Sequence, residues 1–187
     1  MNALLVSTGT VALAEIGDKT QLLALMLAAR YRRPWPIVAG IVIATVLNHA
    51  LAAALGDWLS TLLTPDVLRW IVAGSFIAVA LWTLKPDTLD DGEGGPAKYG
   101  ALVATTIAFF IAEIGDKTQV ATILLAARFH DFGQVVTGTT LGMLLANVPV
   151  VLLGSRFADR LPLRAARLTA AAVFAVLGIW ALVAGVG

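Results

Sequence analysis

The sequence predicts an all-α integral membrane protein of six transmembrane helices, arranged as two inverted three-helix repeats. Of its 187 residues, 59% are hydrophobic and only 13% are charged, whereas a soluble domain carries about 25% charged residues. The apolar stretches lack the two-residue alternation of membrane strands, which favours helices over a β-barrel. The third observation is a duplication, because the heptapeptide EIGDKTQ stands at 15–21 and again at 113–119.

Six segments are long and apolar enough to cross a bilayer, which takes about 20 residues. The first stands where a signal peptide would, but no basic residue precedes its apolar run, and Glu15, Asp18 and Lys19 interrupt it. A signal peptide needs an uninterrupted apolar region, so we expect this segment to be kept as the first transmembrane helix. The six predicted spans are 4–29, 36–55, 67–84, 99–127, 134–154 and 165–186.

The two halves of the chain align without a gap at an offset of 98 positions. The tetrapeptide LAAR at 27–30 recurs at 125–128, and Trp82 falls on Trp180. Each half holds three spans, an odd number, so the second half must enter the membrane from the opposite side. In transporters, repeats of this kind place the binding site near the midplane, between the two halves. The predicted parts are a first repeat at 1–84, an acidic linker at 85–98 and a second repeat at 99–187.

Basic residues near the span ends predict the orientation, because cytoplasmic loops are enriched in Lys and Arg. One side of the predicted membrane has only Arg69 and Arg128. We therefore expect the opposite side and the linker to be cytoplasmic, and both termini to lie outside. The basic residues of the predicted cytoplasmic side are Arg30, Arg32, Arg33, Lys85, Lys98, Arg156, Arg160, Arg164 and Arg167.

Both copies of EIGDKTQ place charged residues deep inside apolar spans. An unpaired acid or lysine at a helix centre costs about 2.5–3.5 kcal/mol, so these groups must neutralise one another, hold protons or bind a ligand. In a continuous helix Glu15 and Asp18 share one face, as do Glu113 and Asp116. Inverted symmetry brings the two faces together, so we expect four carboxylates to form one site for a hard cation such as Mn²⁺, Ca²⁺ or Mg²⁺.

Other polar residues near the acids extend this predicted pathway. Thr20, Gln21, Thr118 and Gln119 are candidates for secondary oxygen ligands, and Lys19 and Lys117 for tuning the charge. Gly17 and Gly115 either bend the helix and free carbonyl oxygens or allow close helix packing. His49, Asn48 and Asn147, inside later spans, either serve the cation and proton pathway or form hydrogen bonds between helices.

Several functions fit these residues. Carboxylates without a cation would hold protons, and a cation would expel them, which is the chemistry of a cation/proton antiporter. Alternatives are a structural ion pair between Glu15 and Lys19, a cation channel, a non-transporting subunit of a membrane assembly, export of a small solute such as an amino acid, and an intramembrane aspartyl protease using Asp18 and Asp116. The absence of cysteine excludes thiolate metal sites, and the net charge of +1 argues against a nucleic-acid partner.

The doubled motif resembles that of a known family. E-x-G-D-(K/R)-(S/T), twice in a six-span protein with inverted halves and an acidic linker, is similar to the Gdt-type cation/proton exchangers. Both copies, EIGDKT at 15–20 and at 113–118, match in full, and the resemblance covers essentially the whole chain. It implies that the acids carry Mn²⁺ or Ca²⁺ as transported substrate, with H⁺ as counter-ion, and that the chain is no enzyme and needs no cofactor. Similarity to the small bacterial members implies Mn²⁺ efflux across a bacterial plasma (inner) membrane.

Overall fold

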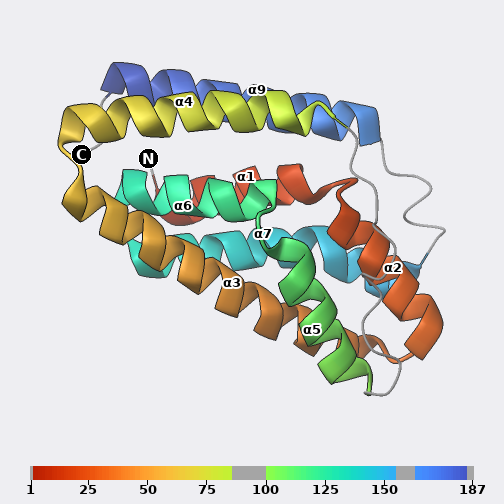
Figure 1. Cartoon of the computed structure of the whole chain (residues 1–187). Helices are drawn as coiled ribbons and strands as arrows, with labels where there is room; N and C mark the ends of the chain where they lie inside the picture. Colours follow the sequence, from red (N-terminus) through yellow and green to blue (C-terminus); the bar gives the residue numbers. More distant parts are fainter. Residues whose placement is uncertain (1, 86–99, 155–162, 185–187) are drawn as a thin grey trace.

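A computed structural model describes residues 2–85, 100–154 and 163–184 of the chain. These residues are helical, without a strand among them (Figure 1). The helices are α1 (Ala3–Glu15), α2 (Lys19–Tyr31), α3 (Pro34–Leu62), α4 (Pro65–Thr83), α5 (Ala101–Glu113), α6 (Lys117–Phe129), α7 (Phe132–Leu153) and α9 (Leu163–Ala184).

Four of these helices, α3, α4, α7 and α9, are long and apolar enough to cross a membrane. They correspond to four of the predicted spans, with α3 extended to Leu62. Both α3 and α4 have proline in the first turn, where its missing N–H leaves no hydrogen bond unmade. Large apolar side chains lie exposed on the outside, including Leu145 and Val183, as a lipid-facing surface requires. The prediction of an all-α membrane protein is confirmed.

The structure differs from the prediction at 4–29 and 99–127, where each expected continuous helix is two helices of 13 residues. The chain turns at Gly17, with φ +81°, and at Gly115, with φ +74°. This left-handed backbone region ends a right-handed helix and favours glycine. No described atom lies within 4 Å of the position that a Cβ on Gly115 would take, so this glycine serves the bend and not close packing.

Equivalent helices of the two halves make equivalent pairs. Helix α7 packs on α1, and α3 packs on α5. A Cβ at Gly138 would lie 2.6 Å from the carbonyl oxygen of Leu4, and one at Gly40 would lie 2.7 Å from Cβ of Thr105. Small residues at such crossings allow the close backbone approach typical of membrane helices. These two glycines occupy the same position in the two halves of the sequence.

Helices α4 and α9 lie side by side as a separate layer over α1 and α6 (Figure 1). The rings of Phe76 and Phe174 stack between α4 and α9 with centroids 6.3 Å apart. A Cβ at Gly178 would lie 3.0 Å from the carbonyl oxygen of Ala73, so these two helices also approach closely.

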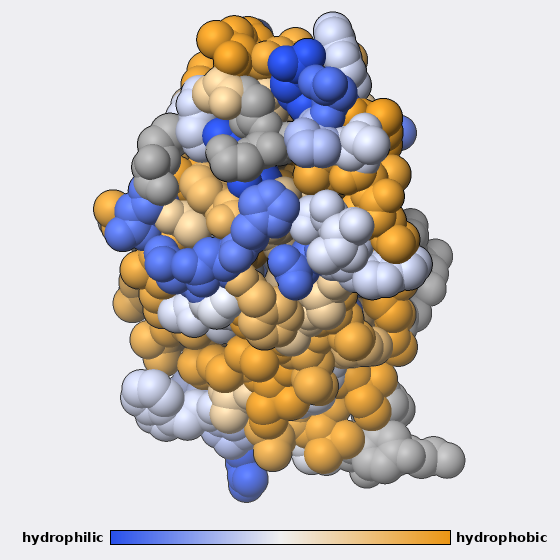
Figure 2. All heavy atoms as spheres, turned by 90° about the vertical axis from the view of Figure 1, so that its left-hand side faces the viewer, coloured by the Kyte–Doolittle hydropathy of each residue, from blue (hydrophilic) through white to orange (hydrophobic). Residues whose placement is uncertain are grey.

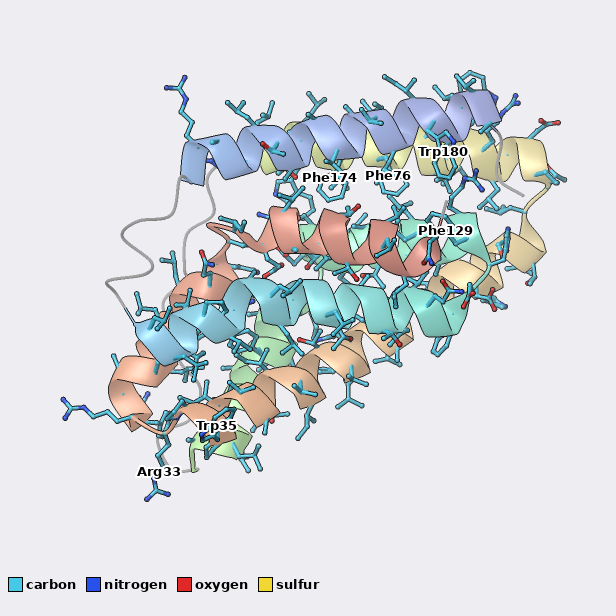
Figure 3. All side chains as sticks on the ribbon, turned by 180° about the vertical axis from the view of Figure 1, so that it is seen from behind. Arg33, Trp35, Phe76, Phe129, Phe174 and Trp180 are labelled. Carbon is cyan, nitrogen blue, oxygen red and sulfur yellow. The ribbon has the colours of Figure 1, made fainter. Side chains whose placement is uncertain are left out.

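The helices define two ends of the molecule. We call end A the end where α1 begins and α9 finishes, and end B the end where α2 finishes and α3 begins (Figure 1). A band of hydrophilic residues crosses end A, with a mostly hydrophobic surface below it (Figure 2). Arg33 and Trp35 lie at end B, opposite Phe129 and Trp180 at end A (Figure 3). Apart from Lys85, the predicted linker lies outside the described residues, as do Arg156 and Arg160.

Candidate metal centre

The two helix breaks place the acids of the duplicated motif. Helix α1 ends at Glu15 and α5 ends at Glu113, each on a glutamate. Asp18 and Asp116 cap the N-termini of the helices that follow, with side chains accepting from Lys19 N–H and Thr118 N–H. Caps of this kind satisfy backbone donors that a helix start leaves open. The acids therefore meet through a turn between two helices, and not through the single helix face expected from their spacing.

Each break is braced by a glutamine of the same motif. Oε1 of Gln21 accepts from Gly17 N–H at 2.9 Å, and Oε1 of Gln119 accepts from Gly115 N–H at 2.8 Å. The amide nitrogen of Gln21 donates to the Ala146 carbonyl at 3.0 Å on α7, and that of Gln119 donates to Oδ1 of Asn48 at 3.4 Å on α3. These contacts make the glutamines supports of the break, and their predicted role as secondary oxygen ligands stays a prediction.

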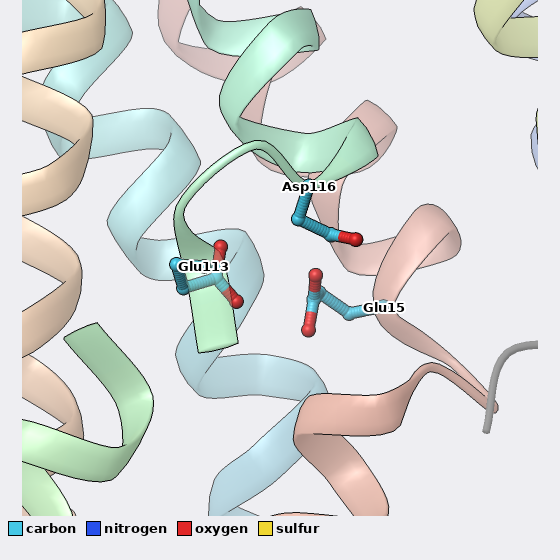
Figure 4. Close-up of side chains that lie close together, drawn as sticks. All are labelled: Glu15, Glu113 and Asp116. Carbon is cyan, nitrogen blue, oxygen red and sulfur yellow. The ribbon is translucent and has the colours of Figure 1, made fainter. Parts of the chain in front are cut away.

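Three carboxylates from both halves of the chain converge. One oxygen each of Glu15, Glu113 and Asp116 lies within 4.8 Å of the others, and Figure 4 shows the three side chains directed toward a common space. Their exposed fractions are 0%, 0% and 3%. Oxygen ligands at about 2.0–2.6 Å from one ion lie up to roughly 5 Å apart, so this spacing suits a single divalent cation.

Each glutamate has one oxygen held by a threonine and one oxygen open. Thr20 Oγ1 donates to Glu15 Oε2, and Thr118 Oγ1 donates to Glu113 Oε2 at 2.9 Å. The other oxygens, Oε1 of Glu15 and of Glu113, are buried without a hydrogen-bond partner among the described residues. A buried carboxylate oxygen left without a donor is costly, and a proton or a cation would satisfy it. The threonines therefore hold the glutamates in position, and the ligand role predicted for them stays a prediction.

A polar residue from a long helix stands beside each glutamate. Nε2 of His49 on α3 lies 3.9 Å from Glu113 Oε2, and Nδ2 of Asn147 on α7 donates to Glu15 Oε2 at 3.4 Å. These two residues are equivalent in the repeat alignment. His49 is fully buried, and neither ring nitrogen has a hydrogen-bond partner among the described residues. The structure thus brings His49 and Asn147 to the acids, while Asn48 donates to the Phe110 carbonyl at 3.0 Å and accepts from Gln119 at 3.4 Å.

Asp18 is placed differently from the other three acids. Its Oδ1 lies 3.1 Å from Nζ of Lys117, and both side chains are buried. This ion pair joins the first half of the chain to the second. The structural ion pair considered from the sequence joined Glu15 to Lys19 along one helix, but Glu15 ends α1 and Lys19 begins α2. The link between Lys117 and Asp18 was missed from the sequence, because a contact across the two halves has no local spacing to mark it.

Buried acids inside a membrane protein are typical of ion-transport sites, and the family comparison agrees. The family model described as "Divalent cation/proton antiporter GDT1" matches residues 3–91 and 101–187. The chain belongs to this family, so the resemblance seen in its motif is confirmed. It is a membrane transporter family and not an enzyme family, which removes the alternative of an aspartyl protease.

Individual relatives are also similar over most of the chain. A Vibrio cholerae protein named "Putative manganese exporter" is 54% identical over 180 residues, which cover 96% of this chain and 90% of that protein. A GDT1-like protein of Synechocystis is 29% identical over 200 residues, covering 93% and 95%. GDT1-like protein 5 of Arabidopsis thaliana is 30% identical over 210 residues, covering 91% and 90%. No solved structure matches the chain.

Proposed function

We propose that this chain exports Mn²⁺ in exchange for protons at a site formed by Glu15, Glu113 and Asp116. The observation that carries the proposal is the convergence of these three buried carboxylates from two helix breaks, one in each half. Membership of a divalent cation/proton antiporter family supports the exchange. The name of the Vibrio cholerae relative supports manganese as the substrate.

The exchange follows from competition for the same oxygens. In the cation-free site, protons would occupy the open oxygens of Glu15 and Glu113, because two buried carboxylates this close cannot both remain charged without a counter-ion. An entering cation would displace these protons, and their return would release the cation. Thr20 and Thr118 would hold the second oxygen of each glutamate in place during both steps. Asp18, paired with Lys117, would balance charge beside the site.

The topology that suits this exchange has six membrane crossings. In it, α1 with α2 and α5 with α6 each form one broken span, and α3, α4, α7 and α9 form the other four. The two halves are then inverted repeats, the arrangement that lets one midplane site face either side in turn. The basic residues at end B, including Arg30, Arg32 and Arg33, support an orientation with this end in the cytoplasm of a bacterial inner membrane and both termini outside.

His49 favours Mn²⁺ over Ca²⁺ as the substrate. Imidazole nitrogen is a common ligand of transition metals, whereas Ca²⁺ takes oxygen ligands almost alone, and Nε2 of His49 lies 3.9 Å from a site carboxylate. The second candidate function is a Ca²⁺/H⁺ antiporter, which the three carboxylates favour because they supply oxygen alone.

Transport in proteoliposomes with an imposed pH gradient tests the proposal. Mn²⁺, Ca²⁺ and Mg²⁺ are offered separately, and internal metal and internal pH are recorded together. We expect Mn²⁺ flux with opposite proton movement, and loss of both in Glu113→Gln. Asp66→Asn is the matched control, since Asp66 is an acid with an exposed side chain on α4. Metal flux without proton movement would contradict the exchange, and full flux in Glu113→Gln would contradict the site.

A further inference from the structure

The two halves carry an equivalent arginine and tryptophan, which lie at opposite ends of the molecule. Arg128 and Trp180 of the second half correspond to Arg30 and Trp82 of the first half. The arginines stand in the last turns of α6 and α2, and the tryptophans near the ends of α9 and α4. We call the pair of Arg128 and Trp180, at end A, latch A, and the pair of Arg30 and Trp82, at end B, latch B.

Latch A is engaged. The guanidinium carbon of Arg128 lies 4.1 Å from the ring centroid of Trp180, within the range of a cation–π contact. The ring of Phe129 supports the same indole, with centroids 6.0 Å apart. Arg128 is only 9% exposed. Figure 3 shows Phe129 and Trp180 together at end A, between the layer of α4 and α9 and the helices beneath it.

Latch B is apart. The guanidinium of Arg30 lies over its own neighbour Tyr31, 5.4 Å from the ring centroid. Arg30 is exposed, and Trp82 is 40% exposed. Within the described part of the chain, no cation–π contact joins Arg30 to Trp82. The arginine and the tryptophan are the same at both latches, so the difference comes from the neighbouring aromatic residue, Phe129 at latch A and Tyr31 at latch B, and from how the helices are placed at the two ends.

A second pair of equivalent positions shows the same difference between the ends. Gly56 lies against the backbone of α6, so that a Cβ there would overlap the carbonyl group of Ile123. Its equivalent, Gly154, has no described atom within 4 Å of its Cβ position. Helix α3 continues past Gly56 to Leu62, whereas α7 ends at Leu153. Among the described residues, the helices at end A are therefore in close contact at Gly56, and the equivalent position at end B, Gly154, makes no such contact.

We infer that the two latches are engaged in turn, each holding its end shut while the other end is released. This inference rests on the proposed exchange, and it adds the residues that set which side the site faces. The acids at the centre are buried, so the structure corresponds to an occluded arrangement, in which latch A is engaged and latch B is released before end B has opened as far as the acids. An inverted repeat predicts a second arrangement in which the contacts at the two ends are exchanged. A cation–π contact suits this use, because it is weak enough to form and break, and an arginine at the end of a span can reach water when it is released.

Cross-linking tests the alternation, and the chain contains no native cysteine to interfere. Arg128→Cys with Trp180→Cys and Arg30→Cys with Trp82→Cys are matched double variants, treated in membranes with a short bifunctional thiol reagent. Without metal, we expect the pair at latch A to cross-link several-fold faster than the pair at latch B. Saturating Mn²⁺ with an imposed pH gradient should raise the rate at latch B and lower it at latch A. Either cross-link should stop flux, and a cross-linker that thiols cleave should restore it on reduction.

Equal cross-linking at both latches under every condition would overturn the inference, as would full flux in a chain cross-linked at either latch. Failure of the proposed function looks different, because the unmodified chain would then show no exchange whatever the cross-linking rates. If a double variant does not assemble, the single variants Arg30→Cys and Arg128→Cys still test whether the two ends differ in accessibility. A membrane-impermeant maleimide should modify the thiol of Arg30→Cys several-fold faster than that of Arg128→Cys, when each is offered the reagent from its own side. Equal rates would count against the inference.

Discussion

At the scale of single residues, the site is a set of paired roles repeated in both halves. A glutamate ends the first helix, a threonine holds one of its oxygens, and a glutamine braces the turn between them. His49 and Asn147 stand in equivalent places but differ in chemistry, since only the histidine carries a ring nitrogen. The site is therefore symmetric in its glutamates, and asymmetric in its aspartates and in the pair of His49 and Asn147.

Protons and the metal should compete for the carboxylate oxygens. We expect the affinity for Mn²⁺ to fall as the pH is lowered from about 8 to about 6, because bound protons must leave before the cation enters. Titration calorimetry in detergent at each pH measures this. Glu113→Gln should bind more weakly and show a smaller dependence on pH, because it removes one of the oxygens that exchange a proton. An affinity independent of pH in the unmodified chain would contradict the competition.

The buried ion pair of Lys117 and Asp18 should be sensitive to losing one partner. Lys117→Gln leaves a carboxylate in a dry interior and should lower the free energy of unfolding by about 3–5 kcal/mol. The double variant with Asp18→Asn should recover much of this loss, since no buried carboxylate is then left without the lysine charge that balances it. Thermal unfolding in detergent measures both. Arg69→Gln is the control, because the pair of Arg69 and Asp66 is exposed and should contribute less than about 1 kcal/mol.

At the scale of elements, the helix breaks decide where the acids go. Gly17 and Gly115 hold a backbone that other residues adopt only with strain, and the aspartate cap starts the next helix one residue later. The turn lets Asp18 and Asp116 face different partners, one a lysine of the other half and one the site itself. A continuous helix would have placed both acids of each copy on the same face.

Replacing the glycine of a break should disturb both stability and transport. Gly17→Ala and Gly115→Ala should each cost about 1–2 kcal/mol, because a Cβ opposes the left-handed backbone, and should lower Mn²⁺ flux by moving the glutamate before it. The matched control is Gly9→Ala in α1, where a Cβ meets no described atom within 4 Å and alanine favours the helix. If Gly17→Ala and Gly115→Ala match Gly9→Ala in both free energy of unfolding and Mn²⁺ flux, the breaks do not position the acids.

The sequence was sufficient to predict the helical membrane class and the family, because composition and a repeated motif can be recognised without knowing the structure. The acids could be named from EIGDKTQ for the same reason. The geometry of the acids and their partners could not be predicted. The spacing of Glu15 and Asp18 was interpreted on a continuous helix, but Gly17 interrupts that helix. The pair of Lys117 and Asp18 depends on how the halves meet, which no local pattern records.

At the scale of the whole molecule, the structure combines near-symmetric pairs with an asymmetric layer. Helices α1 with α7 and α5 with α3 pack alike, whereas α4 packs against α6 and α9 packs against α1, both helices of the layer below. The latches at ends A and B differ in the same way. A chain with two similar halves thus packs them unequally in this structure.

The proposed topology predicts that both termini lie on the same, external face of the membrane. A reporter enzyme active only outside the cytoplasm, fused at either terminus, should therefore be active in cells. The same reporter inserted between α2 and α3, beside Arg32 and Arg33 at end B, should be inactive. Termini on opposite faces would contradict an inverted repeat of three crossings in each half.

The central claim is that one cation is held jointly by carboxylates of both halves, and counting bound metal tests it most directly. We would measure the Mn²⁺ bound per chain, and the protons released with it, for the unmodified protein and for Glu15→Gln and Glu113→Gln. The account predicts one Mn²⁺ per chain with proton release, and a similar loss of affinity whichever half is changed. Two ions per chain, with each variant losing only one of them, would show that each half binds its own cation and would contradict the joint site.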